Sequence, residues 1–300
     1  MTALLIDTSS VFFRAHHALP PLTTSSGEHT AALYGFSSLL LKLLREEAPT
    51  SVAFARDLPT PTFRHERFAE YKAGRPPVPD ALRTQWKHLD ALIAAFGVPS
   101  HALAGFEADD ALATLNLNLT NSAENVLIVS GDRDLMQVVG PLTTLLFIGA
   151  RGQKPEKIDA EKIMARYGIA PAQMPMWLAL VGEAADNLAG VAGIGAKTAS
   201  KLVAQFGSAE NLIAHLDVVM PPKTRTALEA AKERLLLNEN LATLRTDLNL
   251  SAPWALPVTP VALANVREVF DALELKSLVK RLDALKNRRI VPKVDQLRLF

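Results

Sequence analysis

The chain contains no cysteine among its 300 residues. Disulfides, zinc sites built on thiolates and thiol nucleophiles are therefore excluded, and the composition fits a reducing cytoplasm. Long apolar runs are also missing: the first is broken by Asp7, and none reaches the roughly 20 residues needed to span a bilayer. We expect a cytoplasmic protein with no membrane segment.

The chain also lacks an excess of either charge, since it has 32 Lys and Arg and 31 Asp and Glu, which gives a net charge of +1. If many acids crowd one site, however, the remaining surface is more basic than this total, so nucleic acid is not excluded as a partner. With 49% hydrophobic and 21% charged residues, the chain is typical of globular proteins. Its length allows a large domain with a smaller one, which we expect.

What the chain does have is two short acidic segments, Gly105–Asp110 and Ser130–Asp134. The second follows the apolar run 126–129, which is typical of a buried strand, and open α/β sheets bind ligands at such strand ends. Crowded like charges need a cation, and hard carboxylate oxygens favour Mg²⁺ or Mn²⁺. These segments predict a two-metal carboxylate site, although acids at helix N-termini also act simply as caps.

The same placement recurs elsewhere in the chain. Asp7 follows the predicted strand 3–6 and Asp57 follows the predicted strand 51–54, and a further strand is predicted at 144–148. Taken alone, an acid in the position of Asp7 is more often a helix N-cap than a ligand. Glu183 and Asp186 are spaced so that one helix face or turn could present both. The pattern of strands and helices predicts an α/β fold with a mostly parallel sheet flanked by helices.

Basic and aromatic residues alternate between Thr62 and Arg75. Such a pattern suits single-stranded nucleic acid, because cations hold phosphates while rings stack on bases. An amphipathic helix with a solvated face remains the alternative. The flanking stretches 30–44 and 80–96 both carry the apolar period of core helices.

A glycine-rich hairpin from Gly190 to Ala199 opens a predicted helix. Backbone N–H groups at a helix N-terminus bind anions, and glycines let a phosphate approach closely. The spacing to Lys197 is wrong for a Walker loop. The segment looks like a helix-hairpin-helix, which grips the backbone of duplex DNA without reading its sequence.

These motifs together resemble the 5′ nuclease family, which comprises the N-terminal domain of bacterial DNA polymerase I, phage 5′ exonucleases and flap endonucleases. The resemblance covers nearly the whole chain. It rests on Ile6–Ser10 with Arg14, Thr62–Arg64, Tyr71–Lys72, Glu107–Asp110, Gly131–Asp134 and Gly190–Lys197. It implies a PIN-like nuclease core with a helical helix-hairpin-helix domain, and DNA with 5′ flaps, nicks or 5′ ends as partner.

The resemblance also implies roles for individual residues. Asp7, Asp57, Glu107 and Asp109 would surround one metal ion, Asp132 would lie between the two, Asp134 and Asp186 would serve the second, and Asp110 would support the shell. Tyr71, Lys72 and Arg75 match the arch that grips the scissile phosphate, and Arg14 belongs with the catalytic residues. The DNA-binding hairpin would use Gly190, Gly193, Ile194, Gly195, Lys197, Thr198 and Lys201, with K⁺ as a further cation.

Two departures from the family pattern affect this assignment. Glu183 stands where bacterial polymerase members carry Asp, so we rank it below Asp186 as a ligand. Ala189 and Ala192 replace two prolines of the hairpin, but its glycines and Lys197 remain, so DNA binding should survive.

The chain closes with a peptide that resembles the one by which bacterial replication proteins dock on the sliding clamp. Its anchors would be Gln296, Leu297, Leu299 and Phe300, presented after a basic helix at 275–289; a tail folded back on its own core is the alternative. We thus expect a catalytic domain at 1–180 with a helical arch at about 62–100, a helix-hairpin-helix domain at 181–290 and a tail at 291–300.

We therefore expect a monomeric, stand-alone bacterial nuclease that is associated with the nucleoid and acts in primer removal and repair. It would hydrolyse DNA with two Mg²⁺ ions, with Mn²⁺ as a substitute. Two other functions stay open. One is a catalytically weak module that holds branched DNA on the clamp, and the other is a ribonuclease on a related acidic scaffold.

Overall fold

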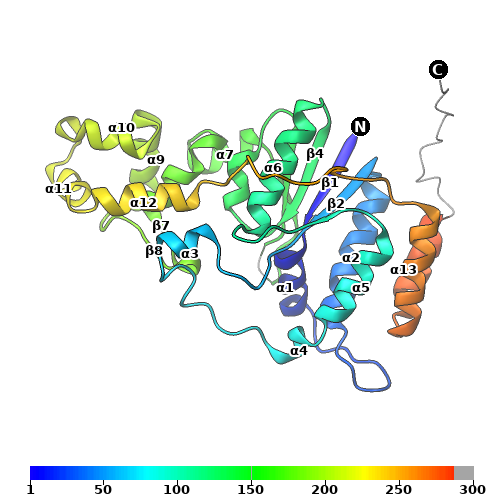
Figure 1. Cartoon of the computed structure of the whole chain (residues 1–300). Helices are drawn as coiled ribbons and strands as arrows, with labels where there is room; N and C mark the ends of the chain where they lie inside the picture. Colours follow the sequence, from blue (N-terminus) through cyan, green and yellow to red (C-terminus); the bar gives the residue numbers. More distant parts are fainter. Residues whose placement is uncertain (150, 287–300) are drawn as a thin grey trace.

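A six-stranded sheet forms the centre of the molecule in a computed structural model that describes residues 1–149 and 151–286 (Figure 1). Its strand order is β3-β2-β1-β4-β5-β6. Strands β1 to β5 are parallel and β6 is antiparallel to β5. The strands are β1 (Thr2–Asp7), β2 (Ser51–Ala55), β3 (Ser100–His101), β4 (Asn125–Ser130), β5 (Thr143–Phe147) and β6 (Glu156–Ile158).

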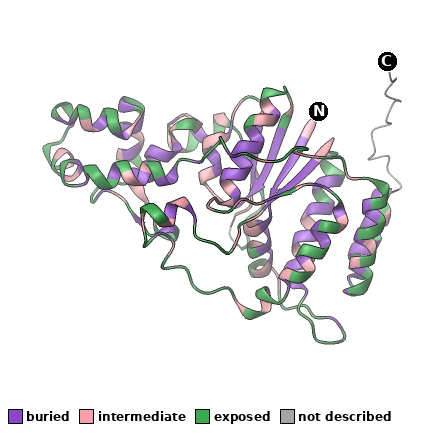
Figure 2. Cartoon of the chain, viewed as in Figure 1, coloured by how far each residue is buried: buried purple, intermediate pink, exposed green. Residues whose placement is uncertain are grey.

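The central strands are apolar on both faces because helices cover both sides of the sheet. Along β1, Leu4 and Ile6 join one core cluster, whereas Ala3 and Leu5 join the other. All four side chains are buried, as the purple strands of Figure 2 show. Buried parallel strands give continuous apolar runs of this kind, which is why the strand predictions succeeded.

Helices from distant parts of the chain pack on these two faces. The face of Leu4 and Ile6 is covered by α1 (Thr8–Ala18), α2 (Ala31–Glu46), α5 (Trp86–Phe96), α13 (Pro260–Ala272) and α14 (Lys276–Lys286). The opposite face packs against α6 (Ala108–Asn121), the 3₁₀ helix η1 (Asp134–Val138), α7 (Ala160–Tyr167) and α8 (Met174–Val181). The predicted α/β class is confirmed.

A helical region follows α7 and extends away from the sheet (Figure 1). It begins with η2 (Pro171–Gln173) before α8, and a short hairpin then joins β7 (Gly182–Glu183) to β8 (Leu188–Ala189) around η3 (Ala184–Asp186). The helices that follow are α9 (Ala196–Phe206), α10 (Ala209–Ala214), η4 (Leu216–Val218), α11 (Pro222–Ala230) and α12 (Lys232–Ala242).

The last two helices do not belong to this helical region, which corrects the predicted boundary at 290. After α12 an extended link returns to the sheet, where Val52 and Leu256 exchange backbone hydrogen bonds. Helix α13 then packs on α5, and α14 packs on α2. Apolar side chains of α13 explain this packing, because Val266 and Phe270 are fully buried in the core cluster of the first domain.

The predicted helical arch at about 62–100 is also wrong for most of its length. Only α3 (Phe63–Arg67) and α4 (Asp80–Arg83) are helical before α5, and α5 is a core helix. Between α3 and α4, residues 68–79 form turns and extended chain (Figure 1). We call this segment the strap. Helix 80–96 is interrupted because Gln85 turns inward and accepts hydrogen bonds from the Ala32 and Leu33 N–H groups at the start of α2.

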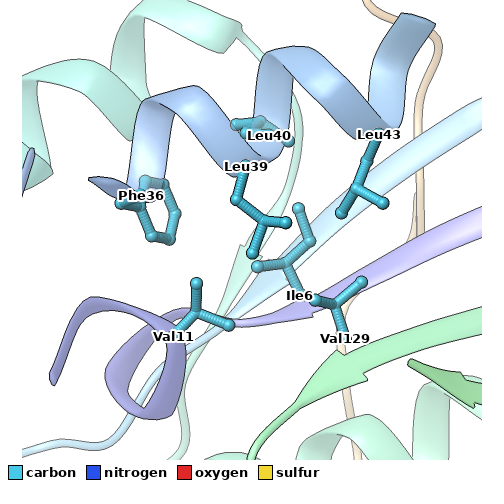
Figure 3. Close-up of a pocket in the computed structure, with 7 residues that line it drawn as sticks. All are labelled: Ile6, Val11, Phe36, Leu39, Leu40, Leu43 and Val129. Carbon is cyan, nitrogen blue, oxygen red and sulfur yellow. The ribbon is translucent and has the colours of Figure 1, made fainter. Parts of the chain in front are cut away.

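A close-up of the packing between α1, α2 and the sheet shows only apolar side chains around a small gap (Figure 3). Ile6, Val11, Phe36 and Val129 are among them. The gap is too small to hold a water molecule. It is therefore a packing feature and no ligand site.

Within the described ranges, every helix is too short or too polar to cross a bilayer.

Candidate active site

The acidic residues meet at the carboxyl ends of the central strands. Strand β1 lies between β2 and β4, so Asp7 at its end is flanked by the segments carrying Asp57 and Asp132. The chain turns in opposite directions from β1 to reach these neighbours, which makes this edge a topological switch point. Sequence reasoning predicted this placement from the strand ends alone.

Two serines connect the Asp7 and Asp132 turns. Asp7 Oδ1 caps α1 by accepting the Ser10 N–H at 2.9 Å, and Asp7 Oδ2 accepts the Ser130 hydroxyl at 2.6 Å. Ser130 Oγ in turn accepts the Asp132 N–H at 2.9 Å, and the Gly131 N–H donates to Ser10 Oγ. Asp7 is thus both an N-cap and a member of the acidic cluster. The sequence analysis missed Ser130, although its position at the strand end before Gly131 was a usable signal.

A second connection places the start of α6 in the cluster. The Ala108 N–H donates to Asp57 Oδ1 at 2.9 Å, and the Asp57 N–H donates to Ser9 Oγ. Glu107 and Asp109 lie on either side of Ala108 and are thereby directed towards the strand ends. Hydrogen bonds from backbone to side chain therefore hold the start of α6 to the loop after β2, and that loop to the start of α1.

The acids lie close enough to one another to shift each other's pKa. Burial, and then the charges of Asp57 and Asp132, raise the pKa of Asp7 to about 7. Burial followed by Asp132 raises the pKa of Asp109 well above its ordinary value. The pKa of Asp134 is raised in the same way, first by burial and then by Asp132 and Asp186. Crowded carboxylates of this kind hold protons unless a cation replaces them.

The strap lies over this cluster and contacts two of its members. The Tyr71 hydroxyl donates to Asp186 Oδ2 at 2.8 Å and to Glu107 Oε2 at 3.2 Å. Lys72 Nζ lies 2.6 Å from Glu107 Oε1, and Arg75 Nη2 lies 2.7 Å from Asp186 Oδ1. The predicted arch residues are therefore at the site, but they reach it from turns rather than from a helix.

Local conformation and charge fix the middle of the strap. Lys72 has φ of 57°, a left-handed conformation that side chains other than glycine rarely adopt. Its N–H donates to the Asp186 carbonyl, which stabilises that turn. Burial alone would lower the pKa of Lys72, but the attraction of Glu107 and Asp186 raises it above the ordinary value. Lys72 is thus charged when it contacts the acids.

Arg14 reaches the cluster from α1. Its Nη2 donates to the Gly131 carbonyl at 2.5 Å, and burial lowers its pKa while Asp132 and Asp7 oppose that shift. A Cβ on Gly131 would lie 1.6 Å from Arg14 Nε, so only glycine leaves room for this side chain. Gly131 is therefore required by the Arg14 contact.

Two of the predicted metal ligands have other partners. Both oxygens of Asp110 are engaged by Arg64, and they also accept the N–H groups of Glu107 and Arg245. Glu183 on β7 forms an ion pair with Arg133. Asp110 is therefore not available as a metal ligand, and an ion at Glu183 would compete with Arg133.

The donor set of the cluster fits divalent cations. Asp109 Oδ1 is buried and has no hydrogen-bond partner, which leaves an oxygen available to an ion. In the described part of the chain, however, no three acidic or histidine side chains are already arranged to hold a metal. Tyr71, Lys72 and Arg75 contact oxygens of Glu107 and Asp186, which an ion at these two residues would have to share or displace.

The raised pKa values predict how the metal-free protein responds to pH. A carboxyl whose pKa is raised in the folded state stabilises the fold below its unfolded pKa, and this contribution is lost as pH rises through the folded value. With Asp7 titrating at about 7, we expect the melting temperature in EDTA to fall between about pH 5 and pH 8. Saturating Mg²⁺ should reduce this fall, because the ion replaces the protons.

Differential scanning calorimetry across this range, with and without Mg²⁺, measures the effect. Asp7→Asn provides the internal comparison, since it removes one of the raised groups and should flatten the curve in EDTA. A melting temperature in EDTA that rises from acidic to mildly alkaline pH would contradict the crowding described above.

The glycine hairpin has the predicted conformation. Gly193 has φ of +80°, and Gly195 is the N-cap of α9, whose exposed Lys197 and Lys201 lie one turn apart. Ile194 is buried in the core, so its side chain is not available to a ligand. The N-terminus of α9 is thus open to an anion with two lysines close by.

Two family models match consecutive parts of the chain. The N-terminal resolvase-like domain of 5′-3′ exonucleases matches residues 2–168, and their C-terminal SAM fold matches residues 169–261. The chain belongs to the 5′-3′ exonuclease family. The predicted family is confirmed, and the models divide the chain before α8, slightly earlier than residue 180.

Curated relatives of this 5′-3′ exonuclease family member are DNA polymerases. DNA polymerase I of Bacillus caldotenax is 37% identical over 286 residues, covering 94% of this chain and 32% of that protein. The thermostable DNA polymerase I of Thermus caldophilus is 38% identical over 283 residues, covering 94% of this chain and 33% of that protein. The chain thus spans about a third of the length of these relatives.

Solved structures share the fold. T5 5′-exonuclease, solved with bound zinc, superposes with a TM-score of 0.67 at 19% identity and covers 96% of this chain and 99% of its own. The catalytic core of Rad2 in complex with a DNA substrate gives a TM-score of 0.63 at 18% identity, covering 94% of this chain and 92% of its own.

The predicted clamp peptide, 296–300, lies outside the described residues.

Proposed function

We propose that this 5′-3′ exonuclease family member is a structure-specific 5′-3′ exonuclease and 5′-flap endonuclease that uses two divalent metal ions, Mg²⁺ being the expected one. Acids at the end of β1, just after β2 and β4, at the start of α6 and in η1 and η3 lie close to one another, and this supports the proposal most strongly. The proposed ligands are Asp7, Asp57, Glu107, Asp109, Asp132, Asp134 and Asp186.

The chain's own residues would position the DNA and the charges. Bound ions would supply activation of a water and neutralisation of the phosphate charge. Lys72 and Arg75 would add positive charge where the attacked phosphate gains negative charge. The open N-terminus of α9, with Lys197 and Lys201, would hold the phosphates of the duplex without reading bases. Buried Ser130 would keep Asp7 and Asp132 oriented between turnovers.

The partners and the pathway extend this proposal. DNA with 5′ flaps, nicks or 5′ ends is the expected substrate, with primer removal and repair as the processes that supply it. The closing Gln296–Phe300 peptide supports docking on the sliding clamp, and K⁺ at the α9 hairpin would be a further cation. We propose that the nuclease acts as a monomer near the nucleoid.

The decisive experiment compares three end-labelled substrates: 5′-flap DNA, nicked duplex DNA and single-stranded RNA. We expect cleavage near the flap junction with Mg²⁺ or Mn²⁺ and none after EDTA, with RNA resistant. Flap binding without any product in both metals would favour a DNA-holding module instead. Preferred cleavage of RNA would favour a ribonuclease.

Lys72→Ala tests the strap. We expect kcat for flap cleavage to fall about 100-fold, since a removed electrostatic donor typically costs that much, while duplex binding stays near wild type. Lys87→Ala is the matched control, because Lys87 on α5 pairs with Glu28 at the surface, and it should leave kcat unchanged. Equal rates for the two variants would exclude Lys72 from the reaction.

A further inference from the structure

Among the described residues, Arg64 has the largest fully buried side chain, with only 1% of its surface exposed. Its guanidinium donates to both oxygens of Asp110, at 2.6 and 2.9 Å, and Nε donates to the Leu241 carbonyl at 2.8 Å. Asp110 is 0% exposed. Removing two charges from water is costly, and this bidentate geometry is what offsets the cost.

Asp110 also accepts hydrogen bonds from two donors other than Arg64. Its Oδ2 accepts the Glu107 N–H at 3.1 Å, and its Oδ1 accepts the Arg245 N–H at 3.0 Å. Arg64 Nη1 also lies 3.4 Å from Glu107 Oε2. Arg64 and Asp110 thus hold both the backbone and the carboxylate of Glu107.

Stability alone does not require this arrangement. A buried ion pair is often no more stabilising than apolar side chains of similar volume, although losing one partner is strongly destabilising. What the pair supplies is geometry: a planar fork that joins α3, the start of α6 and the end of α12 at one point. Glu107, which lies at the acidic cluster, is the member of this junction that bears on chemistry.

We propose that Arg64, acting through Asp110, is a positioning residue that sets the Glu107 carboxylate for divalent-cation binding. The inference rests on the proposed function, because Glu107 is one of its ligands. Through Leu241 and Arg245 the same pair fixes the exit of the helical region against the site, so that the cation site and the DNA-binding helices keep one relative placement.

The test measures Mn²⁺ binding alone, by electron paramagnetic resonance, in a mutant cycle. Arg64→Lys keeps the charge but loses the fork, and we expect about a tenfold weaker Mn²⁺ affinity, the usual scale when a group that orients a metal ligand is lost. In a Glu107→Gln background the same change should have little further effect, because the route through Glu107 is already removed. Arg267→Lys, in the α13 pair with Asp283, is the matched control.

Flap kinetics give the second readout. Arg64→Lys should lower kcat while KM for the flap stays near wild type. Additive effects of Arg64→Lys and Glu107→Gln, or wild-type Mn²⁺ affinity in Arg64→Lys, would overturn the inference. If Arg64→Lys does not fold, the double variant Arg64→Met with Asp110→Asn removes both buried charges and keeps a side-chain oxygen for the N–H groups of Glu107 and Arg245. That variant should melt closer to wild type than Arg64→Met alone yet bind Mn²⁺ weakly, and full Mn²⁺ affinity would overturn the inference.

The two proposals fail in different ways. If wild-type protein neither binds Mn²⁺ nor cleaves the flap, the proposed function fails. If wild-type protein does both and Arg64→Lys matches it, only the positioning role fails.

Discussion

Asp132→Asn should abolish metal-dependent flap cleavage, with a loss of about 1,000-fold or more if the charge supplies several kcal/mol to the reaction. Asp132 is the one acid whose charge raises the pKa of Asp7, Asp109 and Asp134 alike. The amide keeps the volume and the Oδ1 that accepts the Asp134 N–H at 2.9 Å. Single-turnover cleavage of an end-labelled flap measures the loss.

Asp271→Asn on α13 is the control for the chemical change itself, since Asp271 is an exposed partner of Arg267 far along the chain. Duplex binding should be similar in both variants. Near wild-type turnover in Asp132→Asn would remove the acidic cluster as the place of reaction, whatever the family of the chain.

Gly190→Ala should be strongly destabilising. A Cβ at this position would lie 2.4 Å from both the carbonyl carbon and the oxygen of Val181 and 2.6 Å from the Gly182 nitrogen. These are backbone atoms of the last residue of α8 and the first residue of β7, so no side chain can move aside. We expect a loss of about 3 kcal/mol in the free energy of unfolding, as for other overpacked sites, measured by urea titration.

Gly195→Ala in the same hairpin is the matched control. A Cβ there meets open space, and φ of −94° suits any residue. Its cost should not exceed the change of an N-cap from Gly to Ala, about 1 kcal/mol or less. If both variants unfold at the same urea concentration, the close approach of Gly190 to Val181 is not what the hairpin needs.

The sheet and its acidic edge were predictable because their signals are local. The apolar runs before Asp7 and Asp132 have no polar face, which only strands covered on both sides allow. Once the strands are parallel, their carboxyl ends share one edge, so the acids must lie near one another. Asp7 shows the limit of this reasoning, since its two oxygens serve as helix cap and cluster member at once.

The remaining features depend on partners distant in sequence. The Arg64 motif was visible, but nothing local indicated that Asp110 and Leu241 would bury its charge. The apolar face of α13 is like that of any amphipathic helix. The sequence of α13 does not show that its partner is α5. The strap likewise alternates bases and aromatics as a helix would, yet its contacts to Glu107 and Asp186 favour turns.

The return of α13 and α14 to the sheet sets the smallest fragment that should remain soluble. The match to the family's C-terminal model ends at residue 261, which is where α13 begins. A fragment cut there would uncover the apolar surfaces of α2 and α5 on which α14 and α13 pack. Such a contiguous apolar patch favours aggregation, so an expression boundary drawn from the family match alone would yield a truncated fragment that associates with itself.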